Sequence, residues 1–172
     1  MDYYGSLKQM KAFKWFSNRF IPKGARLEGP AWEISAPKDI PVFIRAIPGL
    51  IDDAYMYLET SSSPKNMIKV LKEISITPQL NVLRGIIWPK PMSYHVQASP
   101  KNIETVASLF EGHNAFEVCC HFHVYGNGKI VLEWHDAFFD DPFLVSKVVP
   151  EHKVKSFARE IGSSIIEASF SG

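Results

Sequence analysis

The stretch FEVCCHFHVYGNGKIVLEWHDA, residues 116–137, contains two runs rich in β-branched and aromatic residues on either side of Gly126-Asn127-Gly128. Glycine and asparagine tolerate the left-handed backbone that tight hairpin turns require. Two such runs joined by such a turn predict a β-hairpin. We therefore expect the fold to be built around an antiparallel sheet that contains this hairpin.

The register of the hairpin follows from where its apolar residues lie. A three-residue loop ending at Gly128 would place Tyr125 opposite Lys129, His121 opposite Glu133 and Cys119 opposite His135. One face would then be apolar, with Val118, Cys120, Phe122, Val124, Ile130, Leu132 and Trp134. The other would be mostly polar, with Cys119, His121, His123, Tyr125, Val131, Glu133 and His135. A two-residue Asn127-Gly128 loop would mix both kinds of residue on each face, so the clean separation favours the three-residue loop.

Length and composition indicate one folded domain. The chain has 172 residues, of which 46% are hydrophobic and 22% charged, as in globular rather than disordered proteins. A chain of this length usually forms one domain, so we expect residues 1–172 to be a single unit. Residues 1–30 carry six basic residues against two acidic ones. We therefore divide the unit into a basic N-terminal helix and loop, residues 1–30, and an α+β core, residues 31–172.

Hydrophobic periodicity predicts that helices and strands alternate along the chain. The expected helices cover residues 7–20, 64–74, 100–110 and a last segment from about residue 150, with Gly162 as a possible break. A further short helix is expected within residues 39–51, where Pro48 would end it. The expected strands outside the hairpin cover residues 32–35, 55–59 and 94–97, with an extended run at 86–88. This order predicts an α+β fold: a mainly antiparallel sheet of about five strands with helices packed mostly on one face.

One tetrapeptide, Ser-Pro-Lys-Asn, begins at both Ser63 and Ser99, just before two of the expected helices. Serine as the N-cap followed by proline is a favourable way to start a helix. A duplicated strand–helix unit would explain the repeat. The unequal spacing along the chain favours instead a good helix start that is used twice.

The two cysteines, Cys119 and Cys120, are adjacent. Neighbouring side chains of a strand point to opposite faces, so we expect no disulfide between them. Thiols without a partner suit a reducing compartment, which predicts a cytoplasmic protein. No stretch resembles a signal peptide or approaches the length of a membrane span, so we expect no transmembrane segment.

The polar face of the hairpin is a candidate metal site. Side chains that are opposed, or two apart on one strand, lie close enough for three or four of them to reach one ion. Imidazole and carboxylate are zinc ligands. This interpretation makes His121, His123 and His135 the ligands of zinc or iron, and Glu133 a fourth ligand or a general base. The protein would then be a metal-dependent enzyme of the hydrolase type.

The same face is also a candidate recognition surface, because a rigid sheet that presents charged and aromatic side chains suits binding to a protein. Asp136, Asp140 and Asp141 lack the spacing of a calcium loop and would extend this surface. The expected partner-binding residues are His121, His123, Tyr125, Glu133, His135, Asp136, Asp140 and Asp141.

No common catalytic motif is present: the chain lacks GxGxxG, GxxxxGK, GxSxG and HExxH. This lack favours a small non-enzymatic cytoplasmic binding protein over an enzyme. A role as an inhibitor or a toxin-immunity protein would fit. The expected partner is a protein, and no cofactor is expected unless the zinc alternative holds.

The basic N-terminal helix supports a third interpretation. Lys8, Lys11, Lys14 and Arg19 would allow binding to a membrane surface or to nucleic acid. The lysines do not form a dense run, and the net charge of the chain is only +1. These features favour an ordinary surface helix that packs by its apolar stripe, and they argue against nucleic acid as the partner.

Overall fold

The computed structural model describes residues 23–86, 90–137 and 141–166. The predicted helix at residues 7–20, the run at residues 87 and 88, and Asp140 lie outside these ranges. The strands are β1 (Ala31–Ile34), β2 (Tyr55–Thr60), β3 (Met92–Gln97), β4 (His121–Gly126), β5 (Lys129–Trp134), β6 (Phe143–Ser146) and β7 (Ile165–Ile166). The helices are α2 (Ile40–Ala46), the 3-10 turn η1 (Ile47–Gly49), α3 (Lys65–Ile74), α4 (Pro100–Gly112), α5 (Ala115–Val118) and α6 (Glu151–Glu160).

The strands form one seven-stranded sheet in the order β3-β2-β4-β5-β6-β1-β7, and every neighbouring pair is antiparallel. The predicted α+β class and antiparallel sheet are confirmed, but the sheet is larger than the expected five strands. The additional strands are β6 and β7, which pair with β1. We predicted no strands at these two segments, Phe143–Ser146 and Ile165–Ile166. Their short strands show no alternation long enough to be recognised in the sequence.

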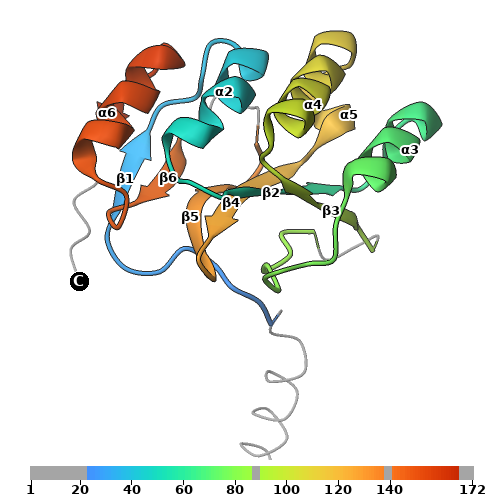
Figure 1. Cartoon of the computed structure of the whole chain (residues 1–172), viewed down its shortest axis with the longest axis horizontal. Helices are drawn as coiled ribbons and strands as arrows, with labels where there is room; N and C mark the ends of the chain where they lie inside the picture. The colour runs from blue at the N-terminus through green and yellow to red at the C-terminus, as the bar shows by residue number, and fades with distance from the viewer. Residues whose placement is uncertain (1–22, 87–89, 138–140, 167–172) are drawn as a thin grey trace, which may run out of the picture.

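The helices α2, α3, α4 and α6 all lie on one face of the sheet, as predicted (Figure 1). Phe43 of α2 lies at the centre of this packing. Its ring centroid is 5.4 to 5.8 Å from the rings of four residues on the strands and on α6: Phe122, Trp134, Phe143 and Phe157. Aromatic rings at such distances and steep angles pack edge to face, which is favourable. No helix within the described ranges is both long enough and apolar enough to cross a membrane.

Residues that start and end the helices act mostly as expected. The Ser99 side chain accepts a hydrogen bond from the Asn102 N–H and caps α4. The repeated tetrapeptide is used differently before α3, because the Ser63 hydroxyl donates to the Glu117 carbonyl instead. Gly162 follows α6 with a φ of +68°, a left-handed conformation that suits the residue after a helix.

The hairpin is present at β4 and β5, but its predicted register is wrong. The turn has two residues, Asn127 and Gly128, with φ angles of 52° and 73°. Gly126 pairs with Lys129, and Tyr125 pairs with Ile130. A β-bulge then shifts the register, so that beyond it Val124 pairs with Leu132, His123 with Glu133 and Phe122 with Trp134.

The bulge explains why the two-residue turn does not mix the faces. The shift occurs between Val124 and Tyr125, where Val131 on the opposite strand is left without a direct partner. Val131 packs with the helix-side core, and Ile130 packs on the other side with Tyr125. These two residues therefore exchange the faces that we predicted for them. An extra residue in one strand restores the separation of polar and apolar side chains.

The start of the predicted hairpin strand is helical. Residues Ala115–Val118 form α5, and Cys119 follows as its C-cap. Cys119 is fully buried in the helix-side core, where its thiol donates to the His121 carbonyl, so its predicted place opposite His135 is wrong. Burial raises the pKa of Cys119.

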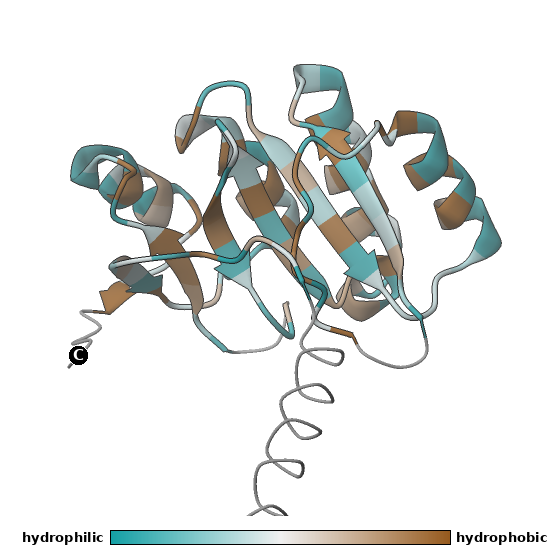
Figure 2. Ribbon diagram, turned by 90° about the horizontal axis from the view of Figure 1, so that it is seen from below, coloured by the Kyte–Doolittle hydropathy of each residue, from teal (hydrophilic) through white to brown (hydrophobic). Residues whose placement is uncertain are grey.

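The opposite face of the sheet carries no helix within the described residues. Two irregular segments cross it: a first strap, residues 23–30, and a second strap, residues 76–86. Both lie below the sheet in Figure 1, and Figure 2 shows this side, with hydrophobic and hydrophilic residues alternating along the strands. The straps pair through Ala25, whose N–H donates to the Asn81 carbonyl and whose carbonyl accepts from the Leu83 N–H. A Cβ atom on Gly24 would lie 2.5 Å from the Leu83 Cα, so this approach requires glycine.

Candidate binding site

Glu59 of β2 fastens the second strap to the sheet. Its side chain points to the strap-covered face and is completely buried. The carboxylate accepts hydrogen bonds from the Gly85 N–H at 3.1 Å, the Ile86 N–H at 2.7 Å and the Tyr57 hydroxyl at 2.7 Å. A buried carboxylate is costly unless such donors replace water. Two consecutive backbone N–H groups therefore fix the end of the strap on one buried charge.

Glu133 of β5 fastens the first strap in the same way. One carboxylate oxygen accepts the Leu27 N–H at 2.6 Å, and the other lies 2.8 Å from the Nε2 atom of His135. Burial would raise the pKa of Glu133, but the hydrogen bonds from His135 and from Leu27 outweigh burial and lower it. The bond to Glu133 also raises the pKa of His135.

His121 and His123 of β4 are both buried on the strap-covered face, and His121 lies against the second strap. The Nδ1 atom of His121 accepts the Asp136 N–H at 3.0 Å. Its ring lies so close to Gly85 that a Cβ atom there would be 2.4 Å from the His121 Cδ2 atom. His123 stacks on Tyr57 with 5.5 Å between ring centroids. Burial lowers the pKa of His121, and it lowers the pKa of His123 to about 3, so both rings are neutral near pH 7.

The straps cover part of the predicted recognition surface. His121, His123 and Tyr125 are at most 7% exposed, so in this conformation little of these three side chains is open to a partner. The Tyr125 hydroxyl is instead 2.9 Å from the Nδ1 atom of His95. Among the members of the predicted set that the structure describes, His135, Asp136 and Asp141 are exposed and Glu133 is partly buried. The sequence did not reveal that backbone N–H groups of distant loops would bind the polar side chains.

The predicted metal ligands do lie on one face. The His135 ring is 5.3 Å from the ring of His121 and 5.0 Å from that of His123. Yet no group of three or more His, Cys, Asp or Glu side chains within the described residues is arranged to hold a metal ion. His121 Nδ1 and both Glu133 oxygens are instead in contact with protein groups. The arrangement acts as a hydrogen-bonded support for the straps.

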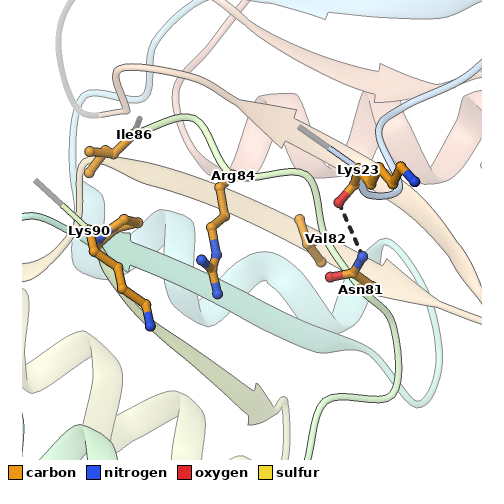
Figure 3. A pocket seen from close by; sticks show the side chains of 7 residues that line it. Lys23, Asn81, Val82, Arg84, Ile86 and Lys90 are labelled. Atoms are coloured by element: carbon orange, nitrogen blue, oxygen red, sulfur yellow. Dashed lines mark hydrogen bonds between the residues drawn. The ribbon is translucent and has the colours of Figure 1, made fainter. Parts of the chain in front are cut away.

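A hollow of about 320 Å³ lies beside the second strap, and we call it the cationic hollow because the side chains of Arg84 and Lys90 line it. It is lined by Lys23, Asn81, Val82, Arg84, Ile86, Lys90 and Pro91. Figure 3 shows Arg84 between Lys90 and Asn81, whose amide donates to the Lys23 carbonyl at 3.1 Å. A second hollow of about 240 Å³, which is lined in part by Tyr57 and His95, shares Asn81, Val82 and Arg84 with the first.

None of Lys23, Arg84 and Lys90 takes part in an ion pair with another described residue. Sequence reasoning counted Lys23 in the basic N-terminal segment and overlooked Arg84 and Lys90. A weak signal was available, since Lys90 lies between two prolines in a segment without helical periodicity. The sequence contained no sign that Lys23 would lie beside Arg84, because the two straps meet only in the folded chain.

Comparison of the chain with protein-family models, with curated proteins and with solved structures found no match. The chemistry of the two straps and of the cationic hollow is therefore the basis for assigning a role.

Proposed function

We propose that this protein is a non-enzymatic binding protein that recognises a protein partner through the second strap. The observation that carries the proposal is the pair of hydrogen bonds from the Gly85 and Ile86 N–H groups to the buried Glu59 carboxylate. This charge holds in place a segment that has no helix or strand of its own. Irregular segments on a rigid scaffold are common recognition elements.

The second strap is also tied at other points. The Ile76 N–H donates to the His95 carbonyl at 2.8 Å, and the Leu83 N–H donates to the Ala25 carbonyl at 2.8 Å. A loop held before binding loses less conformational entropy when it binds, which favours affinity. Between Ile76 and Gly85 the strap presents exposed polar side chains at Gln79, Asn81 and Arg84.

This proposal keeps the role expected from the sequence, including an inhibitor or toxin-immunity role, but moves the contact surface. The polar residues of the hairpin support the straps, and the strap side chains make the contact. The exposed residues His135, Asp136 and Asp141 remain a second candidate edge of that surface. The metal-dependent enzyme gains no supporting observation from the described side chains.

The test is capture of a partner from the native host, followed by binding of the purified partner to the full chain. Hydrogen exchange of the complex is expected to show new protection in residues 76–86. Gln79→Trp, at an exposed position of the strap, is expected to weaken binding by about tenfold or more. Glu73→Trp on α3 is the matched control and should leave binding unchanged. Protection confined to α3 and α4 would contradict the proposal.

A further inference from the structure

We infer that the cationic hollow binds an acidic segment of the protein partner, and that a carboxylate of that segment pairs with Arg84. The inference rests on the proposed function and adds the chemistry of the partner. It is carried by Arg84 and Lys90, whose cationic side chains line one hollow without a described ion-pair partner (Figure 3).

Arg84 is held in position before any ligand arrives. The residue before it, Leu83, is bonded to the first strap, and the residue after it, Gly85, is bonded to Glu59. Val82 is 5% exposed and packs with Tyr57 and Tyr125. The backbone of Arg84 is therefore fixed on both sides while its side chain is exposed. The planar guanidinium can then bind a carboxylate through two parallel hydrogen bonds.

The two carboxylates that bind the straps from the sheet, Glu59 and Glu133, are not available to neutralise these cations. The Glu59 carboxylate is fully buried and already accepts three hydrogen bonds. Glu133 is occupied by the Leu27 N–H and by His135. The like charges of Arg84 and Lys90 beside one hollow repel each other, and an incoming anion would relieve that repulsion.

The shape and charge of the hollow favour an acidic protein segment over nucleic acid. Val82, Ile86 and Pro91 give the hollow apolar walls beside the cations, which suit the methylene groups of glutamate or aspartate. Nucleic-acid binding requires a stripe of cations that follows many phosphates, and the whole chain has a net charge of only +1. Here Arg84 and Lys90 line a single hollow.

The test is binding of a fluorescein-labelled oligoglutamate peptide to the full chain at low salt, measured by fluorescence anisotropy. Arg84→Ala is expected to weaken binding by about tenfold and Lys90→Ala by a smaller factor. The affinity of Arg84→Lys should lie between those of wild type and Arg84→Ala, because lysine keeps the positive charge but lacks the planar guanidinium that forms two parallel hydrogen bonds. The matched control is the double variant Lys69→Ala, Lys72→Ala on α3, which removes exposed charge far from the hollow and should leave the affinity within about twofold.

Several results would overturn the inference. Equal weakening by the α3 control would mean that only net charge matters, and unchanged binding by Arg84→Ala would remove the hollow from the interaction. Tighter binding of an oligothymidylate through the same residues would assign the hollow to nucleic acid. Complete competition by inorganic phosphate at about millimolar concentration would assign it to a small anion.

Measurements with the captured partner distinguish failure of this inference from failure of the proposed function. If the partner protects residues 76–86 but binds Arg84→Ala and Lys90→Ala as tightly as wild type, the function stands and the acidic contact fails. If the oligoglutamate peptide needs Arg84 but the partner protects only the helices, the hollow binds acidic peptides and the proposed recognition surface fails.

Discussion

The backbone N–H of Ile86 donates a 2.7 Å hydrogen bond to the fully buried carboxylate of Glu59, across 27 positions of sequence. A charged group on a central strand thus determines where a distant irregular segment lies. The same carboxylate accepts the Gly85 N–H, so it acts as the anchor of the second strap.

Glu59→Gln should destabilise the fold by about 2 to 3 kcal/mol, because the amide replaces one acceptor oxygen with a donor that faces a backbone N–H. Urea unfolding measures the loss, and hydrogen exchange should increase at Gly85 and Ile86 in particular. Glu73→Gln, on the exposed surface of α3, is the control and should change stability very little. Equal stability of the two variants would refute the anchoring role of Glu59.

Gly85→Ala should destabilise the protein by about 1 to 3 kcal/mol, because the new Cβ would overlap the buried ring of His121. Thermal unfolding measures the effect. Gly112→Ala is the matched control, since a Cβ there meets nothing within 4 Å. If both variants unfold at the temperature of wild type, the second strap does not lie against His121.

His123→Phe should stabilise the protein by about 1 kcal/mol near pH 7. The Nδ1 atom of His123 is buried with no hydrogen-bond partner in the described part of the chain, and phenylalanine keeps the stacking on Tyr57. His95→Phe is the contrasting control, because it breaks the bond between His95 and the Tyr125 hydroxyl and should destabilise. A less stable His123→Phe variant would show that the Nδ1 atom is satisfied.

His123 should also make the folded state sensitive to acid. Its pKa falls from 6.5 to about 3 on folding, so below pH 6.5 the unfolded chain binds a proton that the folded chain refuses. The contribution of His123 to the free energy of unfolding then falls by about 1.4 kcal/mol for each pH unit, until the pH reaches the folded pKa. Urea unfolding of wild type and His123→Phe at a series of pH values measures this effect. The free energy of unfolding should decrease less steeply with falling pH in the variant than in wild type.

The pair of His135 and Glu133 should stabilise the folded state most in mildly acidic solution. The pKa of His135 is raised from 6.5 by folding, so its contribution is fully present below pH 6.5 and is lost as pH rises through the folded pKa. The pKa of Glu133 is lowered from 4.5, so its contribution is present above pH 4.5 and is lost as pH falls through the folded pKa. The pair therefore stabilises most between these two reference values.

His135→Gln tests this window. The loss of stability should be larger at about pH 5.5 than at about pH 8.5. It should remain under about 1 kcal/mol, because the His135 side chain is 45% exposed and solvent screens the pair. NMR titration of His135 in wild type and in Glu133→Gln measures the pKa directly, and an identical pKa in both proteins would contradict the pairing.

Local patterns in the sequence were sufficient to predict most elements. The Gly-Asn-Gly sequence at residues 126–128 located the hairpin, though not its exact turn. The cap at Ser99 located the start of α4, and alternating residues placed Phe122, Val124, Leu132 and Trp134 on the core side. These predictions succeeded because each depends on residues that are neighbours along the chain. Propensity, capping and periodicity act over a few residues and are visible without the fold.

The tertiary structure alone revealed the bulge opposite Val124, the pairing of β6 with β1, the burial of His121 and His123, and the cationic hollow. Each depends on contacts between distant segments, such as Leu27 with Glu133 and Ile86 with Glu59. A backbone N–H has no side-chain identity, so no residue type marks which loop will bind a buried carboxylate. Local sequence therefore predicted the polar face of the hairpin, and long-range hydrogen bonds determined that straps would cover it.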